Sequence, residues 1–369
     1  MNKIALTYGF DWKKTTTGQK KDIWRTLDTV MTIKKSLTKM SYDVDTIKVD
    51  DTFEQQLIKI KEKNPDTLIY WLNEFVNPKF TRSPDNFTVN IIEHVGLPHT
   101  GPSSKTLALG LNKFQTKQLF TELGIKTPDS YIVNFDNLNS IYEYSWDFPV
   151  IVKPLLHGDS LGINKKSVVN GDDYQEISSL VTAIHRKFKE PAIVEQYIGG
   201  ETVRELTLSV LIDHQGGILN LPFVEIDFTK ISFDQKFKFL HHTLKKEIMP
   251  IKILSALSNN YTINICRECN EIIKKMNCVD FARLDVRINE SDRFYIEVNA
   301  FPAKNKGSYI ARAAHTLGIK NKELFGFSLY NTLLKYDLTV TSQLKHLVEP
   351  ILNAFKLQTE FKIAKKLKI

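Results

Sequence analysis

Two neighbouring strand patterns near residue 290 constrain this chain more than any other feature of its sequence. Residues 283–288 alternate polar and apolar side chains, and residues 294–299 form a second strand pattern after a polar turn. Side chains two apart on a strand share a face, so Glu297 and Asn299 project together. If the hairpin pairs about its turn, Asp285 lies close to both. Two carboxylates and an amide oxygen on one face are ligands suited to Mg²⁺ held against the phosphates of a nucleotide.

The alternative is a hairpin with a solvated, charged face, which charge alone leaves open. The order of residues is more specific than charge, because Glu297-x-Asn299 stands directly before Phe-Pro and faces an Arg-x-Asp. We therefore favour a metal site.

The first hundred residues alternate strand and helix patterns, which predicts a parallel sheet with right-handed crossovers. No Gly-x-Gly-x-x-Gly follows the first strand pattern, so a dinucleotide site is not predicted there. A chain of 369 residues exceeds what one hydrophobic core usually supports. We expect an α/β protein with an N-terminal α/β domain, a central domain, a C-terminal domain and a basic helical tail, at 1–100, 101–188, 189–340 and 341–369. Beyond residue 100, helices are predicted at 106–123, 174–188, 262–276 and 307–317.

The composition is that of a protein without a membrane span. Hydrophobic residues make up 42% of the chain, but no apolar run approaches the length needed to cross a bilayer. The N-terminal apolar stretch is too short for a signal peptide and is better interpreted as a first strand. Three cysteines, an odd number, argue against a disulfide framework and for a reducing compartment, so we expect a cytoplasmic protein.

The cysteines also raise the question of a metal or redox site. Cys266 and Cys269 lie three apart on a predicted helix, with Cys278 further on and no second pair. Buried core cysteines are the favoured interpretation.

The formal net charge of +8 does not predict a nucleic-acid partner, because lysines and acids are interspersed through most of the chain. The basic residues concentrate in the tail. A solvated amphipathic helix over 344–369 is favoured there, with contact to a membrane surface or an anionic partner as the alternative. A basic pocket for ATP and carboxylate substrates would also use some of this positive charge.

The hairpin motifs Arg283-x-Asp285 and Glu297-x-Asn299-x-x-Pro302 resemble the metal-binding end of the ATP-grasp superfamily. The surroundings resemble one branch of it, the D-alanine–D-alanine ligases. The resemblance covers roughly residues 94 to 320, and its further motifs stand in the family's order at 100–104, 107–113, 124–129, 148–162 and 192–200. It implies a three-domain ATP-grasp fold with an N-terminal parallel-sheet domain.

The resemblance implies an ATP site. Lys113 and Lys153 match lysines that bind phosphate, although a solvated helix lysine and an outward lysine at a sheet edge are the plain alternatives. The following loop carries glycines that let backbone N–H groups approach a phosphate. Glu205 matches a ribose-binding glutamate, with Glu201 as a competing assignment, because about three extra residues precede it. The remaining matches are to the glycine loop, the adenine-side linker and a mobile-loop lysine: Gly158, Ser160 and Gly162; Glu195, Tyr197 and Ile198; and Lys238.

The resemblance also implies roles around the reacting groups. Mg²⁺, with Mn²⁺ as an alternative, is expected on Asp285, Glu297 and Asn299. Arg283, with a backbone N–H near Ala303, is expected to stabilise the oxyanion of a tetrahedral intermediate, a task suited to a guanidinium that stays charged. Ser308 matches a serine that binds the carboxylate of the second substrate, and a helix N-cap is an equally good and compatible interpretation.

The chain departs from the family's pattern where the first substrate binds. The glutamate that binds the first alanine's amine has no match, and Asp11 and Glu74 only lie in roughly the right regions. The family's Gly-Glu-Asp-Gly segment is replaced by a stretch that begins at Trp71. Asp159 stands where serine is usual, and Phe239 stands where the alanine-specific ligases carry tyrosine. The first-substrate pocket is therefore predicted to be rebuilt, with a hydroxy acid as an open variant.

These observations predict an ATP-dependent carboxylate–amine ligase that forms an amide through an acyl phosphate. The first substrate is expected to be an amino acid or peptide other than D-alanine. A D-alanine–D-alanine or D-alanine–D-lactate ligase of peptidoglycan synthesis is the nearest alternative, and a non-catalytic nucleotide-binding protein is another. The expected partners are small molecules, with a homodimer left open.

Overall fold

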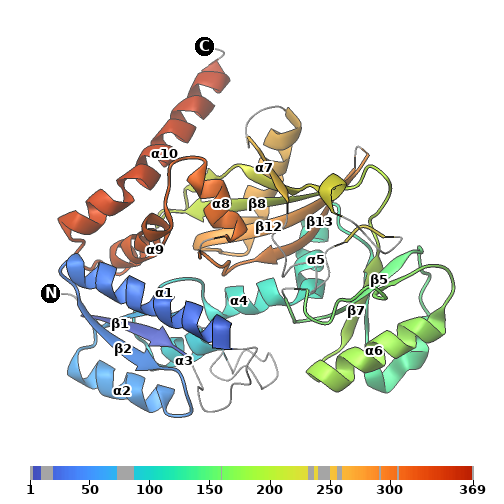
Figure 1. Cartoon of the computed structure of the whole chain (residues 1–369), viewed down its shortest axis with the longest axis horizontal. Helices are drawn as coiled ribbons and strands as arrows, with labels where there is room; N and C mark the ends of the chain where they lie inside the picture. The colour runs from blue at the N-terminus through green and yellow to red at the C-terminus, as the bar shows by residue number, and fades with distance from the viewer. Residues whose placement is uncertain are drawn as a thin grey trace.

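The structure is a computed structural model, and it describes residues 3–9, 20–72, 87–158, 160–231, 237–239, 250–255, 260–290, 292–305 and 307–367, with the side chains of 20–29, 260 and 361–367 left out. Three sheets organise the described chain. Figure 1 shows the N-terminal sheet at one end, the largest sheet in the middle and a smaller sheet at the far side, with α4 between the first and the last.

The N-terminal sheet is parallel, as predicted, with strand order β2-β1-β3. The sequence Ile4-Ala-Leu-Thr of β1 is buried on both faces, which is the pattern of a central parallel strand. A parallel bridge between Ile69 and His99 continues the sheet beyond β3. The strands and their covering helices are β1 (Lys3–Tyr8), α1 (Lys20–Lys39), β2 (Asp43–Lys48), α2 (Phe53–Lys63), β3 (Leu68–Tyr70) and α3 (Thr88–Val95).

The single helix predicted at 106–123 is wrong, because the chain forms α4 (Ser104–Leu111) and α5 (Lys113–Glu122). Asn112 is extended, with φ −82° and ψ 96°, and its side chain accepts a hydrogen bond from the N–H of Gln115 at 3.1 Å. Asparagine competes well for this capping position. The break makes Lys113 the first residue of a helix.

The smaller sheet is antiparallel, with strand order β4-β7-β5-β6. Strand β6 pairs only with Val150 and Ile151 of β5, but Lys153 is 8% exposed, so the alternative of an outward lysine is wrong. Helix α6 has the predicted bounds and packs its apolar side against this sheet. The elements are β4 (Ser130–Val133), the 3₁₀ segment η2 (Phe135–Tyr142), β5 (Val150–Pro154), β6 (Val168–Val169), α6 (Tyr174–Phe188) and β7 (Ala192–Gln196).

The largest sheet has strand order β11-β10-β8-β12-β13, with β9 paired to β8. Its elements are β8 (Arg204–Ile212), β9 (Ile218–Asn220), β10 (Phe223–Ile226), η3 (Phe228–Lys230), β11 (Ile251–Leu254), β12 (Asp280–Asn289) and β13 (Asp292–Asn299). The helices that follow or interrupt it are α7 (Asn260–Lys275), α8 (Tyr309–His315) and α9 (Asn321–Lys335), close to the bounds predicted for the first two.

The two faces of this sheet have different neighbours, which fixes the position of the candidate site. Leu284 and Val286 of β12 point into a core shared with α7 and α5. All three cysteines are free and buried in that core, which confirms the structural interpretation. The intervening residues Arg283, Asp285 and Arg287 therefore project from the opposite face.

The C-terminal helix α10 (Ser342–Leu367) is formed as predicted, but one side of it is not solvated. Leu344, Val348 and Ile351 are buried against α9. The side chain of Gln358 donates to the carbonyl of Ile218 at 2.8 Å and accepts from the N–H of Asn220 at 3.0 Å. The helix is thus docked on β9, and Figure 1 shows its end projecting from the molecule.

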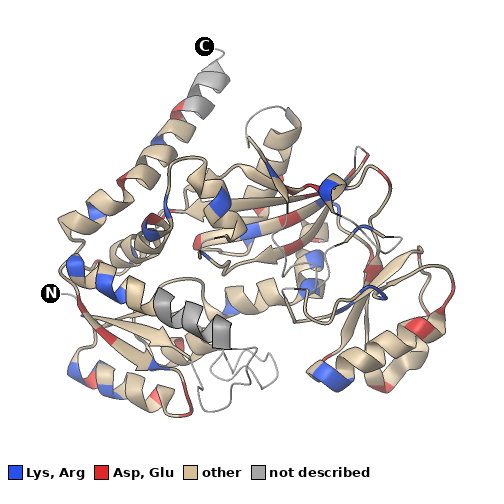
Figure 2. Ribbon diagram, viewed as in Figure 1, with Lys and Arg blue, Asp and Glu red and all other residues tan. Residues whose placement is uncertain are grey.

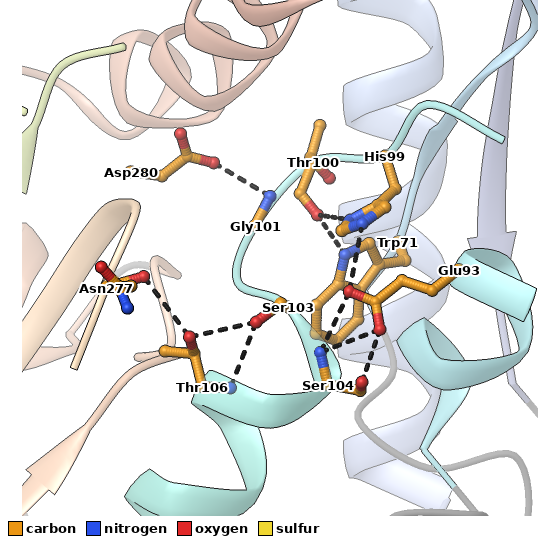
Figure 3. Close-up of polar contacts among 10 residues, drawn as sticks. All are labelled: Trp71, Glu93, His99, Thr100, Gly101, Ser103, Ser104, Thr106, Asn277 and Asp280. Atoms are coloured by element: carbon orange, nitrogen blue, oxygen red, sulfur yellow. Dashed lines mark hydrogen bonds and ion pairs between the residues drawn. The ribbon is translucent and has the colours of Figure 1, made fainter. Parts of the chain in front are cut away.

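The segment 99–106 connects the N-terminal sheet to the largest sheet (Figure 3). The Gly101 N–H donates to Asp280 Oδ2 at 3.0 Å, and Thr106 Oγ1 donates to the carbonyl of Met276 at 3.1 Å. Burial raises the pKa of Asp280, although the donors Ser328, Asn331 and Gly101 oppose the shift. A largely buried hydrogen-bond network therefore holds the entry to α4.

Charge is distributed over the whole surface. Figure 2 shows basic and acidic residues close together along α2 and where α5 faces β12 and β13. No helix in the described part of the chain is both long and apolar enough to span a bilayer.

Candidate active site

The hairpin of β12 and β13 brings the predicted metal ligands together. Asp285 is directly opposite Glu297, and Arg283 is directly opposite Asn299. The register shifts between Asp285 and Val286, which marks a bulge in β13 with Ile296 as the extra residue, next to Glu297. The predicted proximity of Asp285 to Glu297 and Asn299 is confirmed.

Arg283 lies between the two carboxylates. Its Nη2 is 3.1 Å from Asp285 Oδ2 and 3.7 Å from Glu297 Oε1. Thr207 donates to the other Asp285 oxygen at 2.7 Å, and Asn299 Oδ1 accepts from the N–H of Phe301 at 2.9 Å. The site therefore presents hard oxygen atoms with a guanidinium that offsets their charge.

Lys113 is buried, so the alternative of a solvated helix lysine is wrong. It is 6% exposed, and its Nζ donates to the carbonyls of Pro154 at 3.0 Å and His157 at 2.6 Å. Burial lowers the pKa of Lys113 to about 8, and the neighbouring Lys153 also lowers it, while Glu297 opposes both. Lys113 thus holds the chain that leads into the glycine-containing loop.

The carboxylate of Glu195 contacts two lysines in the structure. Lys153 Nζ contacts its Oε1, and Lys117 Nζ lies 3.1 Å from its Oε2. Sequence reasoning missed Lys117. The available signal was its position four residues after Lys113, which places both on one face of α5.

The positions of the glycine-containing loop differ in the space around them. Gly162 has φ +79°, and a Cβ there would lie 2.6 Å from Pro154 and 2.7 Å from the ring of Phe188, so only glycine fits. A Cβ at Gly158 would meet nothing within 4 Å, and Ser160 has φ +53°. Asp159 lies outside the described residues.

Glu190, which sequence reasoning also missed, supports the start of this loop. It is 5% exposed, and its Oε1 accepts from the N–H groups of Leu156 at 3.0 Å and His157 at 3.3 Å. Its other oxygen lies 2.8 Å from His157 Nδ1. The loop entry is therefore held by Glu190 on the N–H side and by Lys113 on the carbonyl side.

A single pocket joins these two parts. Lys113 and Gly158 line it from the loop side, and Arg283, Glu297 and Asn299 line it from the hairpin. Its remaining walls are apolar or small residues of α4, of the chain after β5, and of β13 and the residue that follows it. Five of the residues predicted to act on phosphate, metal or oxyanion thus face one space.

A second group surrounds Tyr197. Its hydroxyl donates to the carbonyl of Lys238 at 2.9 Å, and the same carbonyl accepts from Arg287. Arg287 lies 3.6 Å from Glu205, and Lys238 Nζ donates to the carbonyl of Glu201 at 2.9 Å. The structure therefore gathers the predicted adenine-side, ribose-side and mobile-loop residues, with Arg287 as the link that sequence reasoning missed.

The remaining predicted residues have ordinary structural surroundings. Ser308 Oγ accepts from the N–H of Ala311 at 3.3 Å, which confirms the N-cap of α8. Ile198 is buried beside Tyr197. Phe239 is 4% exposed, and its ring meets that of Tyr197 edge-on with centroids 6.2 Å apart. Asp11 and Glu74 lie outside the described residues.

The chain is similar to known proteins over most of its length. The family model described as "D-ala D-ala ligase C-terminus" matches residues 119–327. The D-alanine–D-alanine ligase of Aquifex aeolicus is 26% identical over 302 residues, which are 81% of this chain and 92% of that protein. The corresponding ligase of Haemophilus ducreyi is 25% identical over 325 residues, which are 87% and 95% of the two chains.

Solved structures share the fold. The D-alanine–D-alanine ligase from Bacillus anthracis complexed with ATP aligns with a TM-score of 0.63 at 19% identity, covering 91% of this chain and 99% of that one. The VanG D-Ala:D-Ser ligase from Enterococcus faecalis aligns with a TM-score of 0.64 at 17% identity, covering 90% and 99%. An N-terminal parallel sheet followed by two antiparallel sheets is thus the three-part ATP-grasp architecture of ligases, as predicted. Within that class, the chain belongs to the D-alanine–D-alanine ligase family.

Proposed function

We propose that this ATP-dependent ligase joins the carboxylate of one amino acid or peptide to the amine of a second, through an acyl phosphate, and that D-alanine is not its preferred first substrate. The observation that carries the proposal is the shared pocket. Lys113 and Gly158 of the loop side line the same space as Arg283, Glu297 and Asn299 of the hairpin. Phosphate-binding and charge-stabilising groups therefore converge on one reacting centre.

ATP is the nucleotide substrate in this proposal. We assign Lys113 and Lys153 to its phosphates. The backbone of the loop at Gly158, Ser160 and Gly162 binds them as well in this assignment. The open space at Gly158 supports this assignment, because a ligand phosphate needs close approach to backbone N–H groups. Tyr197 and Ile198, which follow the end of β7, lie on the adenine side with Glu195 in this assignment. Glu205 takes the ribose and Lys238 covers the site.

The hairpin residues fit Mg²⁺ by their chemistry. Asp285 and Glu297 place two carboxylates opposite each other, and Asn299 adds an amide oxygen on the same face. Asp285, Glu297 and Asn299 would hold the ion, which supplies compensation for phosphate charge when bound. Mn²⁺ has the same preference for such oxygen ligands.

Arg283 is the residue that acts on the carbonyl under attack. The Arg283 side chain is 17% exposed and lines the pocket, so its guanidinium reaches a ligand while remaining largely desolvated. A fixed cation in such a place favours the developing oxyanion more than the neutral ground state. Ser308, at the start of α8, is assigned to the carboxylate of the second substrate.

The altered first-substrate region supports the statement on D-alanine. Trp71 is fully buried and stacks on Phe301, with ring centroids 4.0 Å apart. Its Nε1 donates to the carbonyl of Thr100. Trp71 stands where the family's Gly-Glu-Asp-Gly segment begins, and its indole packs on Phe301, which is two residues after Asn299. Phe239 lacks the hydroxyl of the tyrosine it replaces.

The test is a product screen. Purified protein is incubated with ATP, Mg²⁺ and a mixed pool of amino and hydroxy acids, and both phosphate release and the new product mass are measured. Phosphate release with an amide product supports the proposal, and an ester product would identify a hydroxy acid as the acceptor. Rapid D-alanyl-D-alanine formation from D-alanine alone would establish the nearest alternative instead. ATP binding without turnover on any pool would establish a non-catalytic binder.

A further inference from the structure

A buried ion cluster, in which one carboxylate contacts two ammonium groups, lies beside the glycine-containing loop. Lys117 is 3% exposed and Glu195 is 2% exposed, with Lys117 Nζ 3.1 Å from Glu195 Oε2. Lys153 Nζ contacts the other carboxylate oxygen. One carboxylate therefore serves two ammonium groups, one at each oxygen.

The two lysines differ in what else they contact. Lys117 Nζ also donates to Thr127 Oγ1 at 3.1 Å, and the Thr127 hydroxyl donates in turn to the carbonyl of Tyr295 at 2.8 Å. The side chain of Lys153 is 10% exposed, against 3% for Lys117. Lys117 is thus fixed inside the protein, and the ammonium of Lys153 is the more accessible of the two.

We propose that Lys117 is a positioning residue, which keeps Glu195 ionised and compensated while Lys153 moves its ammonium from Glu195 to a phosphate of the nucleotide. This inference rests on the proposed function, because it assumes that Lys153 binds ATP phosphate. Without a second cation, that movement leaves a buried carboxylate unpaired, which is strongly unfavourable. Lys117 removes this obstacle and makes Lys153 available at neutral pH.

The electrostatics of the cluster agree with this role. Burial raises the pKa of Glu195, but the ammonium groups of Lys117 and Lys153 outweigh burial and bring it below its usual value. Burial lowers the pKa of Lys117, and Glu195 opposes that shift. The other charged groups that face the cluster are Lys113 of α5, Glu190 before β7 and Glu297 of β13.

The test is calorimetric titration of Lys117→Met with Mg²⁺–ATP and with adenosine between pH 6.5 and 8, in buffers of different ionisation enthalpy. Glu195 should take up a proton when Lys153 leaves it, so the variant should bind about one more proton per ATP than the wild type. Its dissociation constant for ATP should rise by about 10-fold per pH unit over the range in which Glu195 is ionised without ATP and protonated with ATP bound. Adenosine affinity should not change. Comparison with the wild type is needed, because Lys113 titrates near pH 8 in both proteins.

Two further variants control the result. Lys126→Met removes an exposed lysine that pairs with Asp292 on the surface, and it should behave as the wild type. Lys117→Met/Glu195→Gln removes the carboxylate together with its second cation, and it should restore the wild-type proton count. If the single variant does not fold, this double variant still tests the idea against the wild type. If the wild type binds one more proton per ATP than the double variant, then Glu195 takes up a proton even with Lys117 present, and the proposed role of Lys117 is overturned.

The remaining outcomes separate the two proposals. Equal proton counts in Lys117→Met and the wild type overturn the role of Lys117 and leave the proposed function intact. Equal weakening of ATP and adenosine in Lys117→Met overturns it as well, because Lys117 is then structural. A wild type that binds no ATP at all contradicts the proposed function itself.

Discussion

Replacing Lys304 with methionine should remove a pH dependence from the stability of this protein. Lys304 is 8% exposed and lies over the rings of Phe301 and Phe281, with Nζ 4.6 Å and 5.0 Å from their centroids. Burial lowers the pKa of Lys304 to about 8, with Asp280 opposing the shift. The buried amine thus gives up its proton more readily in the folded protein than in the unfolded chain.

The sign and size follow from linkage. An unfolded lysine titrates near pH 10.4, so between about pH 8 and that value the unfolded chain binds more protons than the folded one. Stability therefore rises with pH over this window. For a folded pKa of about 8, the contribution of Lys304 to the free energy of unfolding increases by about 2 kcal/mol between pH 7.5 and 9.5.

Urea unfolding of the wild type and Lys304→Met, followed by far-UV circular dichroism at intervals over this range, measures the difference. Lys113 and Lys117 are also buried with lowered pKa values, so both proteins retain their contribution to the rise and only the difference is informative. Asp280→Asn is the matched variant, because loss of the carboxylate lowers the pKa of Lys304 further and moves the rise to lower pH. A Lys304→Met protein that keeps the full wild-type slope would refute the reasoning.

Three other changes test the site and its loop. Glu297→Gln or Asp285→Asn should lower turnover roughly 100-fold at limiting Mg²⁺ with the fold retained, by analogy with the loss of other electrostatic groups. Near wild-type rates in both variants would contradict the metal assignment. Lys153→Ala should weaken ATP more than adenosine in calorimetric titrations, since its partner is phosphate, and an equal loss would make it structural. Gly162→Ala should lower the free energy of unfolding by about 1–3 kcal/mol more than Gly171→Ala. Both glycines have positive φ, but of the two only Gly162 has neighbours that a Cβ would meet. Equal losses in the two variants would show that backbone strain alone decides the effect.

The parts of the site that the sequence predicted are those set by local periodicity. A strand alternates its side chains by geometry, so the Glu297 and Asn299 face could be deduced without knowing the rest of the fold. Helix α6 was predictable for the same reason, since its apolar spacing and its cap at Asp173 are local. The pairing of Val286 with Tyr295 would by itself place Ile296 opposite Asp285, and the bulge brings Glu297 there instead, which alternation alone did not predict.

The break at Asn112 was missed because apolar spacing continues on both sides of it. Whether an asparagine stays in a helix or caps a new one depends on competition between backbone and side-chain hydrogen bonds, and these differ by only about 1 kcal/mol. The consequence was large for Lys113. As the first residue of α5 it points toward the chain at 154–157, whereas a lysine in the middle of a helix more commonly lies at the surface, which was the alternative left open.

Glu190, Arg287 and Lys117 were missed for a different reason. Each is a charged residue whose burial is compensated by groups remote in sequence, and no local pattern distinguishes such a residue from a solvated one. Glu190 is 34 residues from the Leu156 N–H that it accepts from, and Arg287 is 49 residues from the Lys238 carbonyl. Only the packing of the sheets brings these partners together.

The spacing of Lys113 and Lys117 nevertheless contained information. Two lysines four apart on a helix repel each other, an arrangement that is unfavourable by a few tenths of a kcal/mol even in water and more so away from it. Both are buried here and Lys153 joins them, while Glu195 is the carboxylate in direct contact with the group. Glu195 contacts two of the three amines, and Glu190 and Glu297 also favour the charged form of Lys113, so a bound anion would add to this stabilisation. Under the proposed function this anion is the polyphosphate of ATP, and Glu195 holds Lys117 and Lys153 in place before the nucleotide binds.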